Sequence, residues 1–337
     1  MDLNLSDEQR QLVDSFTALY ARESSSQRVR AAEPLGFDPE LWQALRTTGV
    51  IEMALGEADG GWGATVADLA LMAEQSGRAL ASAPVIEAQV AAGVLARAGA
   101  SELLSAVLEG RRLVTFAPRA GRGATLTMVP AAAVADTVVA LIDERLLAIP
   151  VTGERRPVTN LGSMPLTDLT IGADAAVVAE GECAAQLYSD ALDLWLTLTA
   201  AALVGAGAKA VEMAVEYAKQ RHAFGQAIGA FQAVSHPLAD SATAVDGARL
   251  IALKAACAFD DEPNRVTELA AMAFTFAYEA ARDATRRSLH IHGGYGFGME
   301  GDIQLYYRRV RGWALVFGEP NVALDRVADA RYGAVPA

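Results

Sequence analysis

The sequence has few of the residues that build disulfides and metal centres. Its 337 residues include two cysteines, Cys183 and Cys257, and four histidines. Two cysteines outside any C-x-x-C pattern cannot form a disulfide framework, so we expect buried, reduced side chains and a cytoplasmic protein. The pair His290 and His292 has no further Cys or His close by, and the residues before it have a helical pattern. A metal site at this pair is therefore not expected.

Long hydrophobic runs and an excess of positive charge are also missing. The longest apolar run, residues 194–208, is shorter than the roughly 20 residues that cross a bilayer, so we interpret it as a buried helix. The N-terminal stretch is acidic and amphipathic, which does not fit a signal peptide. A net charge of −13 argues against a general nucleic-acid binder, which needs a basic face. We expect a globular protein that has neither a nucleic acid nor a membrane as its partner.

The spacing of apolar residues divides the chain into three segments. Residues 1–110 have helical spacing, interrupted by a glycine-rich loop. Residues 111–183 contain short β-rich runs broken by Pro, Gly and Asp, and residues 184–337 return to long alanine-rich helical stretches. The sequence predicts a mainly α protein: an N-terminal helical domain, a short middle β domain built as an antiparallel sheet or barrel, and a C-terminal helical bundle.

Two glycine-containing motifs lie in the C-terminal segment. The first, R-x-x-F-G, begins at Arg221 and is followed by a Phe-Gln pair; the second, H-I-H-G-G-Y-G-F-G, covers residues 290–298. Neither glycine run follows a strand and leads into a helix, and neither contains G-K-S/T, so neither is a Rossmann or P-loop motif. From the residues alone, Arg221 is more typical of a salt bridge at a helix end than of a ligand-binding residue, and Gly293 and Gly294 are typical of a helix C-terminal cap.

Taken together and in this order, with an upstream glycine loop and a helix that ends in Gly-Arg, these motifs resemble the acyl-CoA dehydrogenase family over nearly the whole chain. The resemblance implies that family's helical bundle, β-barrel and four-helix bundle. It also implies FAD bound across a subunit interface, with its pyrophosphate and adenine contacted by a guanidinium, an aromatic ring and closely approaching backbone N–H groups. The residues that inherit this contact are Arg221, Phe224, Gln232, His290 (usually Gln in the family), Gly293 and Gly294.

The catalytic base is where the sequence departs from the family. Dehydrogenation next to a thioester needs a carboxylate in a dry pocket, where desolvation raises its pKa. Ungapped alignment puts Phe317 at the usual Glu position, and Glu319, two residues on, is the alternative base. A smaller group of the family has its Glu on an earlier helix, at a position that falls near Trp195. The acids nearest to that position, Asp190 and Asp193, do not match it.

The middle segment departs as well, because it lacks the T-E-x-x-x-G-S-D-like stretch and the W-x-T/S strand that hold the flavin ring. We therefore predict no catalytic residue in this chain. It resembles the non-catalytic subunit of actinobacterial α2β2 enzymes that act on steroid side-chain CoA thioesters. The implied partners are a catalytic acyl-CoA dehydrogenase subunit that shares its FAD, an acyl-CoA substrate and an electron-transfer flavoprotein. The alternatives are a complete homo-oligomeric dehydrogenase that uses Glu319, and a scaffold or acyl-CoA-binding protein without a redox role.

Overall fold

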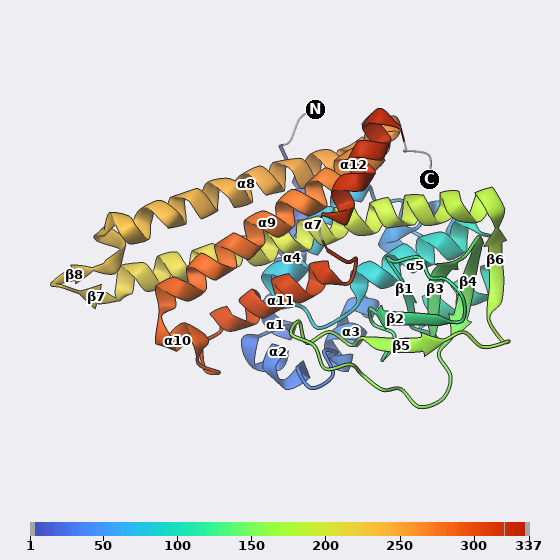
Figure 1. Ribbon diagram of the computed structural model, residues 1–337, viewed down its shortest axis with the longest axis horizontal. Coiled ribbons are helices and arrows are strands. Elements are labelled where there is room, and N and C mark those ends of the chain that lie inside the picture. Colours follow the sequence, from blue (N-terminus) through green and yellow to red (C-terminus); the bar gives the residue numbers. More distant parts are fainter. Residues whose placement is uncertain (1–3, 320, 334–337) are drawn as a thin grey trace.

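The computed structural model describes residues 4–319 and 321–333 and begins with a helical domain (Figure 1). Its first helices start at residues that cap them. Ser6 and Gln9 form a capping box on α1, and the Asp38 side chain accepts hydrogen bonds from two backbone N–H groups of α3, whose first residue is a proline. Thr65 and Asp68 form a second capping box on α4. The helices are α1 (Asp7–Glu23), α2 (Ser26–Ala32), α3 (Pro39–Thr47), α4 (Val66–Arg78), α5 (Val85–Arg97) and α6 (Ser101–Leu108).

The middle domain consists of two small sheets instead of one antiparallel sheet. Its strands are β1 (Val114–Phe116), β2 (Thr125–Val129), β3 (Thr137–Ile142), β4 (Arg145–Pro150), β5 (Thr167–Thr170) and β6 (Ala176–Glu180). The larger sheet has the order β1-β3-β4-β6, and its β1–β3 pair is parallel. Because β2 leaves this sheet to pair with β5, the chain returns to β3 in the same direction as β1. The expectation of a purely antiparallel sheet was wrong at this pair.

The C-terminal domain is a bundle in which α9 contacts the five helices α7, α8, α10, α11 and α12. The helices are α7 (Gly181–Gln220), α8 (Gln232–Asp261), α9 (Val266–His292), α10 (Gly294–Phe297), α11 (Ile303–Leu315) and α12 (Val322–Tyr332). Helix α7 also packs on α4 with the two backbones in contact. A Cβ added to Gly77 would lie 1.9 Å from the Ala202 carbonyl oxygen, and one added to Gly205 would lie 2.0 Å from that of Glu74. These two glycines therefore fix the N-terminal domain against the bundle.

Helix α7 is long and apolar enough to cross a membrane by length and composition, but 89% of its most apolar window is buried inside the protein. Its apolar faces are used by the core, as expected for residues 194–208. The expectation of two buried cysteines was wrong for Cys183, which is exposed, while Cys257 is half-buried. Cys183 lies in the first turn of α7, where the residues before Ala184 face solvent.

Candidate functional site

A β-hairpin connects α7 to α8 and extends beyond the bundle, at the same end of the molecule as α10 (Figure 1). Its strands are β7 (His222–Ala223) and β8 (Gln226–Ala227), so the turn consists of Phe224 and Gly225. Both turn residues have positive φ, 52° and 84°, as the favoured two-residue hairpin turns of type I′ require. A positive φ is costly for phenylalanine, and the Phe224 ring is nevertheless 95% exposed. The fold thus holds an aromatic side chain out in solvent at an energetic cost.

Arg221 and Gln232 lie on either side of this hairpin. Arg221 is the C-terminal cap of α7, and its backbone N–H donates to the Tyr217 carbonyl oxygen at 2.8 Å. The Arg221 side chain is exposed and forms no ion pair or hydrogen bond with any residue that the structure describes. Gln232 is the exposed first residue of α8. The alternative of a helix-end salt bridge for Arg221 finds no acidic partner here, and the guanidinium is free to bind an anion.

The predicted glycine cap is found at the end of α9. Gly293 has a φ of 59°, and its N–H donates to the His290 carbonyl oxygen at 3.0 Å. A Cβ added to either Gly293 or Gly294 would meet no heavy atom within 4 Å, so the backbone is open to an approaching group. His290 is exposed beside it. A cap alone requires only Gly293, so the open Gly294 is consistent with a surface that another molecule approaches.

A small apolar cluster joins the end of α9 to the hairpin region. Ile291 packs with Ala218 of α7 and Leu238 of α8. The Arg287 guanidinium also donates to the Ser241 hydroxyl of α8 at 3.2 Å. These contacts place the ends of the three helices together. We use the name "projecting end" for this region, which includes the six residues predicted to contact FAD: Arg221, Phe224, Gln232, His290, Gly293 and Gly294.

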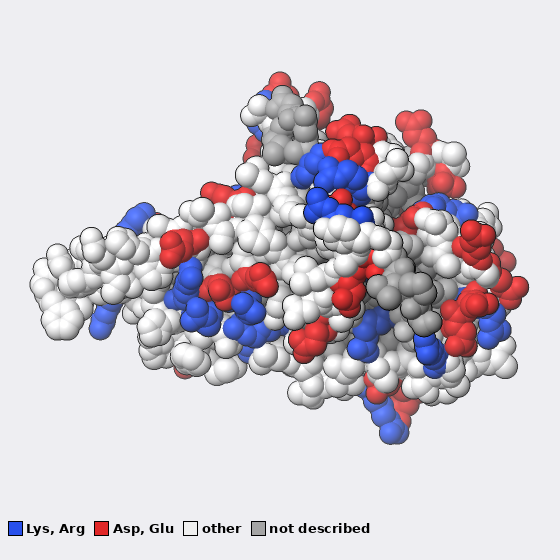
Figure 2. Space-filling model, turned by 45° about the horizontal axis from the view of Figure 1, so that its top comes forward, with Lys and Arg blue, Asp and Glu red and all other residues white. Residues whose placement is uncertain are grey.

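Three further exposed apolar side chains at the projecting end were not identified from the sequence. Tyr295 and Phe297 are in α10, and Met299 follows it. Figure 2 shows that this end carries few charged side chains on the face in view. The only sequence signal for Tyr295, Phe297 and Met299 is that apolar residues alternate with glycines after the cap. Exposed apolar groups gathered in this way are typical of an interaction surface.

The two histidines of this region have separate environments. His292 is buried, its Nδ1 lies 2.7 Å from the Ser288 carbonyl oxygen, and its ring stacks on Tyr217 at 4.5 Å between centroids. His290 points to solvent instead. Within residues 4–319 and 321–333 there is no group of three or more His, Cys, Asp or Glu side chains arranged to hold a metal ion. His292 therefore has a structural role.

The two residues that the sequence aligns with or near the family's base, Phe317 and Trp195, are adjacent in space, and both are aromatic. Phe317 and Trp195 are buried and lie 6.2 Å apart between ring centroids. Phe274 packs edge-on against Phe317 at 5.7 Å and lies 5.9 Å from Trp195. We call these three residues the aromatic cluster. A carboxylate is absent from both positions, and the space it would occupy is filled by core packing.

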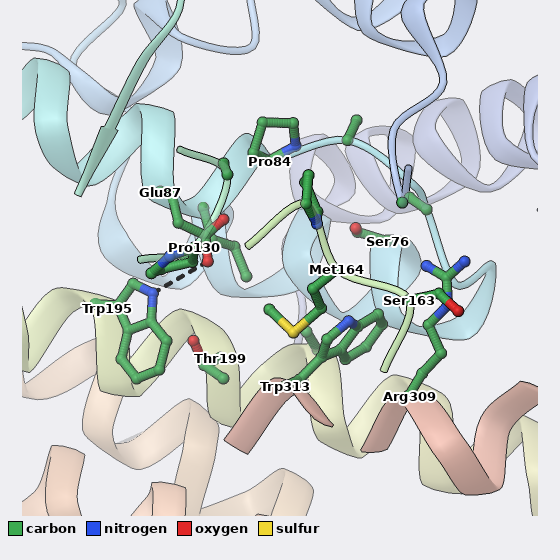
Figure 3. Close-up of a pocket in the computed structure, with 17 residues that line it drawn as sticks. Ser76, Pro84, Glu87, Pro130, Ser163, Met164, Trp195, Thr199, Arg309 and Trp313 are labelled. Atoms are coloured by element: carbon green, nitrogen blue, oxygen red, sulfur yellow. Dashed lines mark hydrogen bonds between the residues drawn. The ribbon is translucent and has the colours of Figure 1, made fainter. Parts of the chain in front are cut away.

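A glutamate that the sequence did not single out borders the aromatic cluster. Glu87 of α5 accepts a hydrogen bond from Trp195 Nε1 at 3.3 Å, and burial raises the pKa of its carboxyl. Both residues line a cavity of about 80 Å³ between α4, α5, α7 and α11 (Figure 3). An acid in the first turn of a helix is a common helix-stabilising choice, so its position in the sequence did not indicate the cavity.

The other candidate acids are engaged or exposed. Asp190 accepts a hydrogen bond from Arg97 at 2.5 Å, and Asp193 forms an ion pair with Arg326 at 2.6 Å. Burial raises the pKa of the Asp193 carboxyl, and the Arg326 charge offsets part of that effect. Glu319 is exposed on the surface. None of the three acids lines the cavity beside Trp195, so none has the dry, substrate-facing position that a base requires.

The segment that should carry the flavin platform is a shallow hollow of about 290 Å³. Its wall includes Arg119, whose guanidinium donates to the Thr127 carbonyl oxygen at 3.2 Å. The aromatic residue of β1, Phe116, faces away into the core against Tyr188 at 5.4 Å. No aromatic side chain is found among the described residues that line the hollow. The residues that line this hollow therefore offer no aromatic ring for a flavin to stack on, whereas the projecting end presents an exposed guanidinium and an exposed aromatic ring.

Known families and relatives agree with this architecture. The chain matches the N-terminal domain of acyl-CoA dehydrogenase over residues 6–110 and the C-terminal domain over residues 189–331. The chain therefore belongs to the acyl-CoA dehydrogenase family, and the predicted family and fold class are confirmed. It is 30% identical to acyl-CoA dehydrogenase IpdE2 of Mycolicibacterium smegmatis over 334 residues, which cover 96% of this chain and 98% of that protein.

Two solved structures of multi-chain enzymes are also similar. The Tcur3481–Tcur3483 steroid ACAD superposes with a TM-score of 0.85 at 26% identity, covering 96% of this chain and 97% of that one. The ChsE4–ChsE5 complex from Mycobacterium tuberculosis gives a TM-score of 0.88 at 24% identity over the full length of both chains. At this level of identity, the similarity to the ChsE4–ChsE5 complex shows a shared fold and nothing more.

Proposed function

We propose that this chain is the non-catalytic subunit of a heteromeric, FAD-dependent acyl-CoA dehydrogenase. The observation that carries the proposal is the aromatic cluster: both positions where the family has its base hold aromatic rings that pack on one another. Proton abstraction from the α-carbon of a thioester requires a group that accepts a proton. Neither ring can accept a proton, and the carboxylate beside Trp195, Glu87, already accepts a hydrogen bond from its Nε1, so we propose that the base comes from another subunit.

The projecting end completes the cofactor site of that partner. The unpaired Arg221 guanidinium binds the pyrophosphate, Phe224 covers the adenine, and the open backbone at Gly293 and Gly294 lies against the cofactor. Gln232 and His290 supply further hydrogen-bonding groups at the same end. FAD supplies the hydride acceptor when bound, and its flavin ring lies in the partner, because the hollow in this chain lacks a platform for it.

The relatives support a proposal for the substrate class. One of the similar structures is described as a steroid ACAD, and both are heteromeric assemblies. We propose an α2β2 enzyme of the cytoplasm that acts on CoA thioesters of steroid side chains, including those of cholesterol, and passes electrons to an electron-transfer flavoprotein. An assembly in which half of the subunits carry no active site leaves more room for a bulky ring system at the other half.

A complete homo-oligomeric enzyme that uses Glu319 is the weaker candidate, because Glu319 is exposed and lines no part of the cavity. One experiment separates the two functions: the chain is purified alone and together with the acyl-CoA dehydrogenase encoded beside it. We expect a colourless, inactive chain alone and an equimolar, flavin-containing, active complex. Flavin and dehydrogenase activity in the chain alone would contradict the proposal. A mixture that forms no flavin-containing complex would favour a scaffold or acyl-CoA-binding protein.

A further inference from the structure

Arg309 of α11 is a buried cation without an acidic partner. Its side chain is 2% exposed, and no Asp or Glu oxygen lies within 4 Å of it in the described part of the chain. Its Nη2 donates to the Ser82 hydroxyl at 3.1 Å, its Nη1 lies 3.4 Å from the Leu80 carbonyl oxygen, and its Nε has no hydrogen-bond partner. Burial lowers the pKa of this guanidinium to about 10. A buried charge with no counter-charge is costly for a folded protein.

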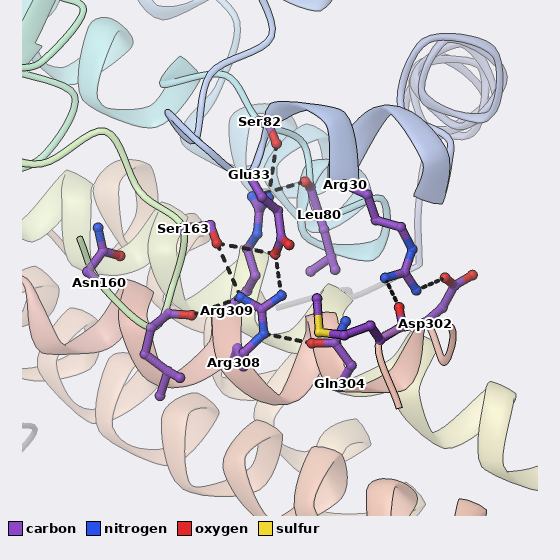
Figure 4. Close-up of polar contacts among 12 residues, drawn as sticks. Arg30, Glu33, Leu80, Ser82, Asn160, Ser163, Asp302, Gln304, Arg308 and Arg309 are labelled. Atoms are coloured by element: carbon purple, nitrogen blue, oxygen red, sulfur yellow. Dashed lines mark hydrogen bonds and ion pairs between the residues drawn. The ribbon is translucent and has the colours of Figure 1, made fainter. Parts of the chain in front are cut away.

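The two acids labelled in Figure 4, Glu33 and Asp302, are paired with arginines other than Arg309. Glu33 forms an ion pair with Arg308, which also donates to the Ser163 hydroxyl at 3.2 Å. Asp302 accepts from Arg30 at 2.7 Å. The charge of Glu33 raises the pKa of Arg309 from a longer distance, but the effect of burial is larger. The two carboxylates thus provide counter-charges for Arg308 and Arg30, and Arg309 has none.

Arg309 also lines the cavity of about 80 Å³ that Glu87 and Trp195 border. In Figure 3, Arg309 and Glu87 lie at opposite ends, with Met164 and Trp313 between them. A water molecule needs about 10–15 Å³ of such volume, so the cavity has room for several atoms beyond one water. Met164 and Trp313 are only half-buried, which leaves a route from solvent.

We propose that this cavity binds a small organic carboxylate, with the size range of acetate to butyrate, and that Arg309 is its counter-ion. A planar guanidinium pairs with a carboxylate through two parallel hydrogen bonds, and the described residues accept hydrogen bonds from only two of the five N–H groups of Arg309. The short hydrocarbon chain lies against Trp313, Met164 and the proline and alanine side chains of the wall. A phosphate dianion would bury a second charge among these apolar groups, so the cavity favours the singly charged carboxylate.

The first test measures thermal unfolding of the full-length chain in sodium propionate and in sodium chloride of the same ionic strength. We expect propionate to raise the unfolding temperature saturably by a few degrees, because a ligand that binds only the folded state stabilises it. The variant Arg309→Met should lose this rise, and Arg156→Met should keep it because the Arg156 side chain is 82% exposed and does not line the cavity. Equal rises in both salts, or a rise that Arg309→Met retains, would overturn the proposal.

A second measurement does not depend on the folding of a variant. Propionate labelled with ¹³C at its carboxyl should show line broadening that saturates with wild-type protein and is reversed by unlabelled butyrate. Broadening that stays linear with propionate concentration and is unaffected by butyrate would overturn the site. Because neither readout needs the flavin or the partner subunit, the result is independent of the proposed heteromeric function.

Discussion

The projecting end and the aromatic cluster lie in the same C-terminal domain and have opposite physical character. At the projecting end, Phe224 is held out in solvent at a positive φ, and the Arg221 side chain has no partner among the described residues. In the cluster, Phe317 and Trp195 are buried and packed. The first region keeps groups that its own fold does not use, whereas the second is packed as core. The proposed role as a non-catalytic subunit predicts this contrast.

The largest expected effect is a loss of stability after a substitution in the aromatic cluster. Phe317→Ala removes a ring that packs on Trp195 and Phe274 and should lower the free energy of unfolding by about 3–5 kcal/mol. Denaturant unfolding of the isolated chain measures this loss. The activity per assembled complex should stay within about twofold, because Phe317 carries no chemistry. A loss of activity in assembled complex that exceeds the loss of folded protein would place Phe317 in the active site.

The corresponding substitution at the projecting end should weaken FAD binding and leave the stability of the folded chain unchanged. Arg221→Met removes a charge-assisted hydrogen bond to the pyrophosphate, worth about 1.5–3 kcal/mol, so FAD should dissociate from the complex about 10- to 100-fold more readily. Flavin release during gel filtration or fluorescence titration with FAD measures this. Arg156→Met is the control for the loss of an exposed arginine. Unchanged FAD affinity together with a lower unfolding temperature would mean that Arg221 has a structural role.

A pH-dependent effect is expected where Glu87 borders the cluster. Burial raises its pKa, so the folded state binds this proton more tightly than the unfolded state. The stability that this bound proton gives the folded protein is fully present at pH values below the pKa of Glu87 in the unfolded chain. It is lost as the pH rises through the pKa of Glu87 in the folded protein. Glu87→Gln has no such loss and can still accept from Trp195 Nε1. Its gain in unfolding temperature over the wild type should therefore be larger at about pH 8 than at about pH 4. An equal difference at both pH values would show that Glu87 is not desolvated.

The smallest effect is expected at Glu319. Because this carboxylate is exposed and outside the cavity, Glu319→Gln should leave kcat and KM of the assembled complex unchanged within experimental error. Steady-state kinetics of the complex with an acyl-CoA substrate provide the measurement. A decrease of two orders of magnitude or more in kcat would make Glu319 the base and this chain the catalytic subunit.

The sequence predicted those features that depend on local chemistry. The mainly helical fold with a small β region follows from the spacing of apolar residues, the start of α3 follows from the Asp38–Pro39 pair, and the end of α9 follows from Gly293. The parallel pairing of β1 with β3 was not predictable, because the partner of a strand is chosen by contacts far away in the chain. The exposure of Cys183 likewise depends on which face of α7 meets the sheet.

The candidate site was predictable only in part, for a related reason. A motif such as R-x-x-F-G is contiguous and can be recognised, whereas the cavity is assembled from four helices and the loops between several elements. Glu87 and Arg309 come together there although they are more than 200 residues apart in the sequence. Their unusual states result from burial, and burial of one charged residue cannot be read from its neighbours in the chain.

The most direct measurement of the division of labour is an experimental structure of the assembled complex with FAD bound. We expect the pyrophosphate of each FAD within hydrogen-bond distance of Arg221, the adenine against Phe224, and the flavin ring in the partner subunit. A flavin ring in the hollow beside Arg119 of this chain, with Arg221 facing solvent, would contradict the proposed function.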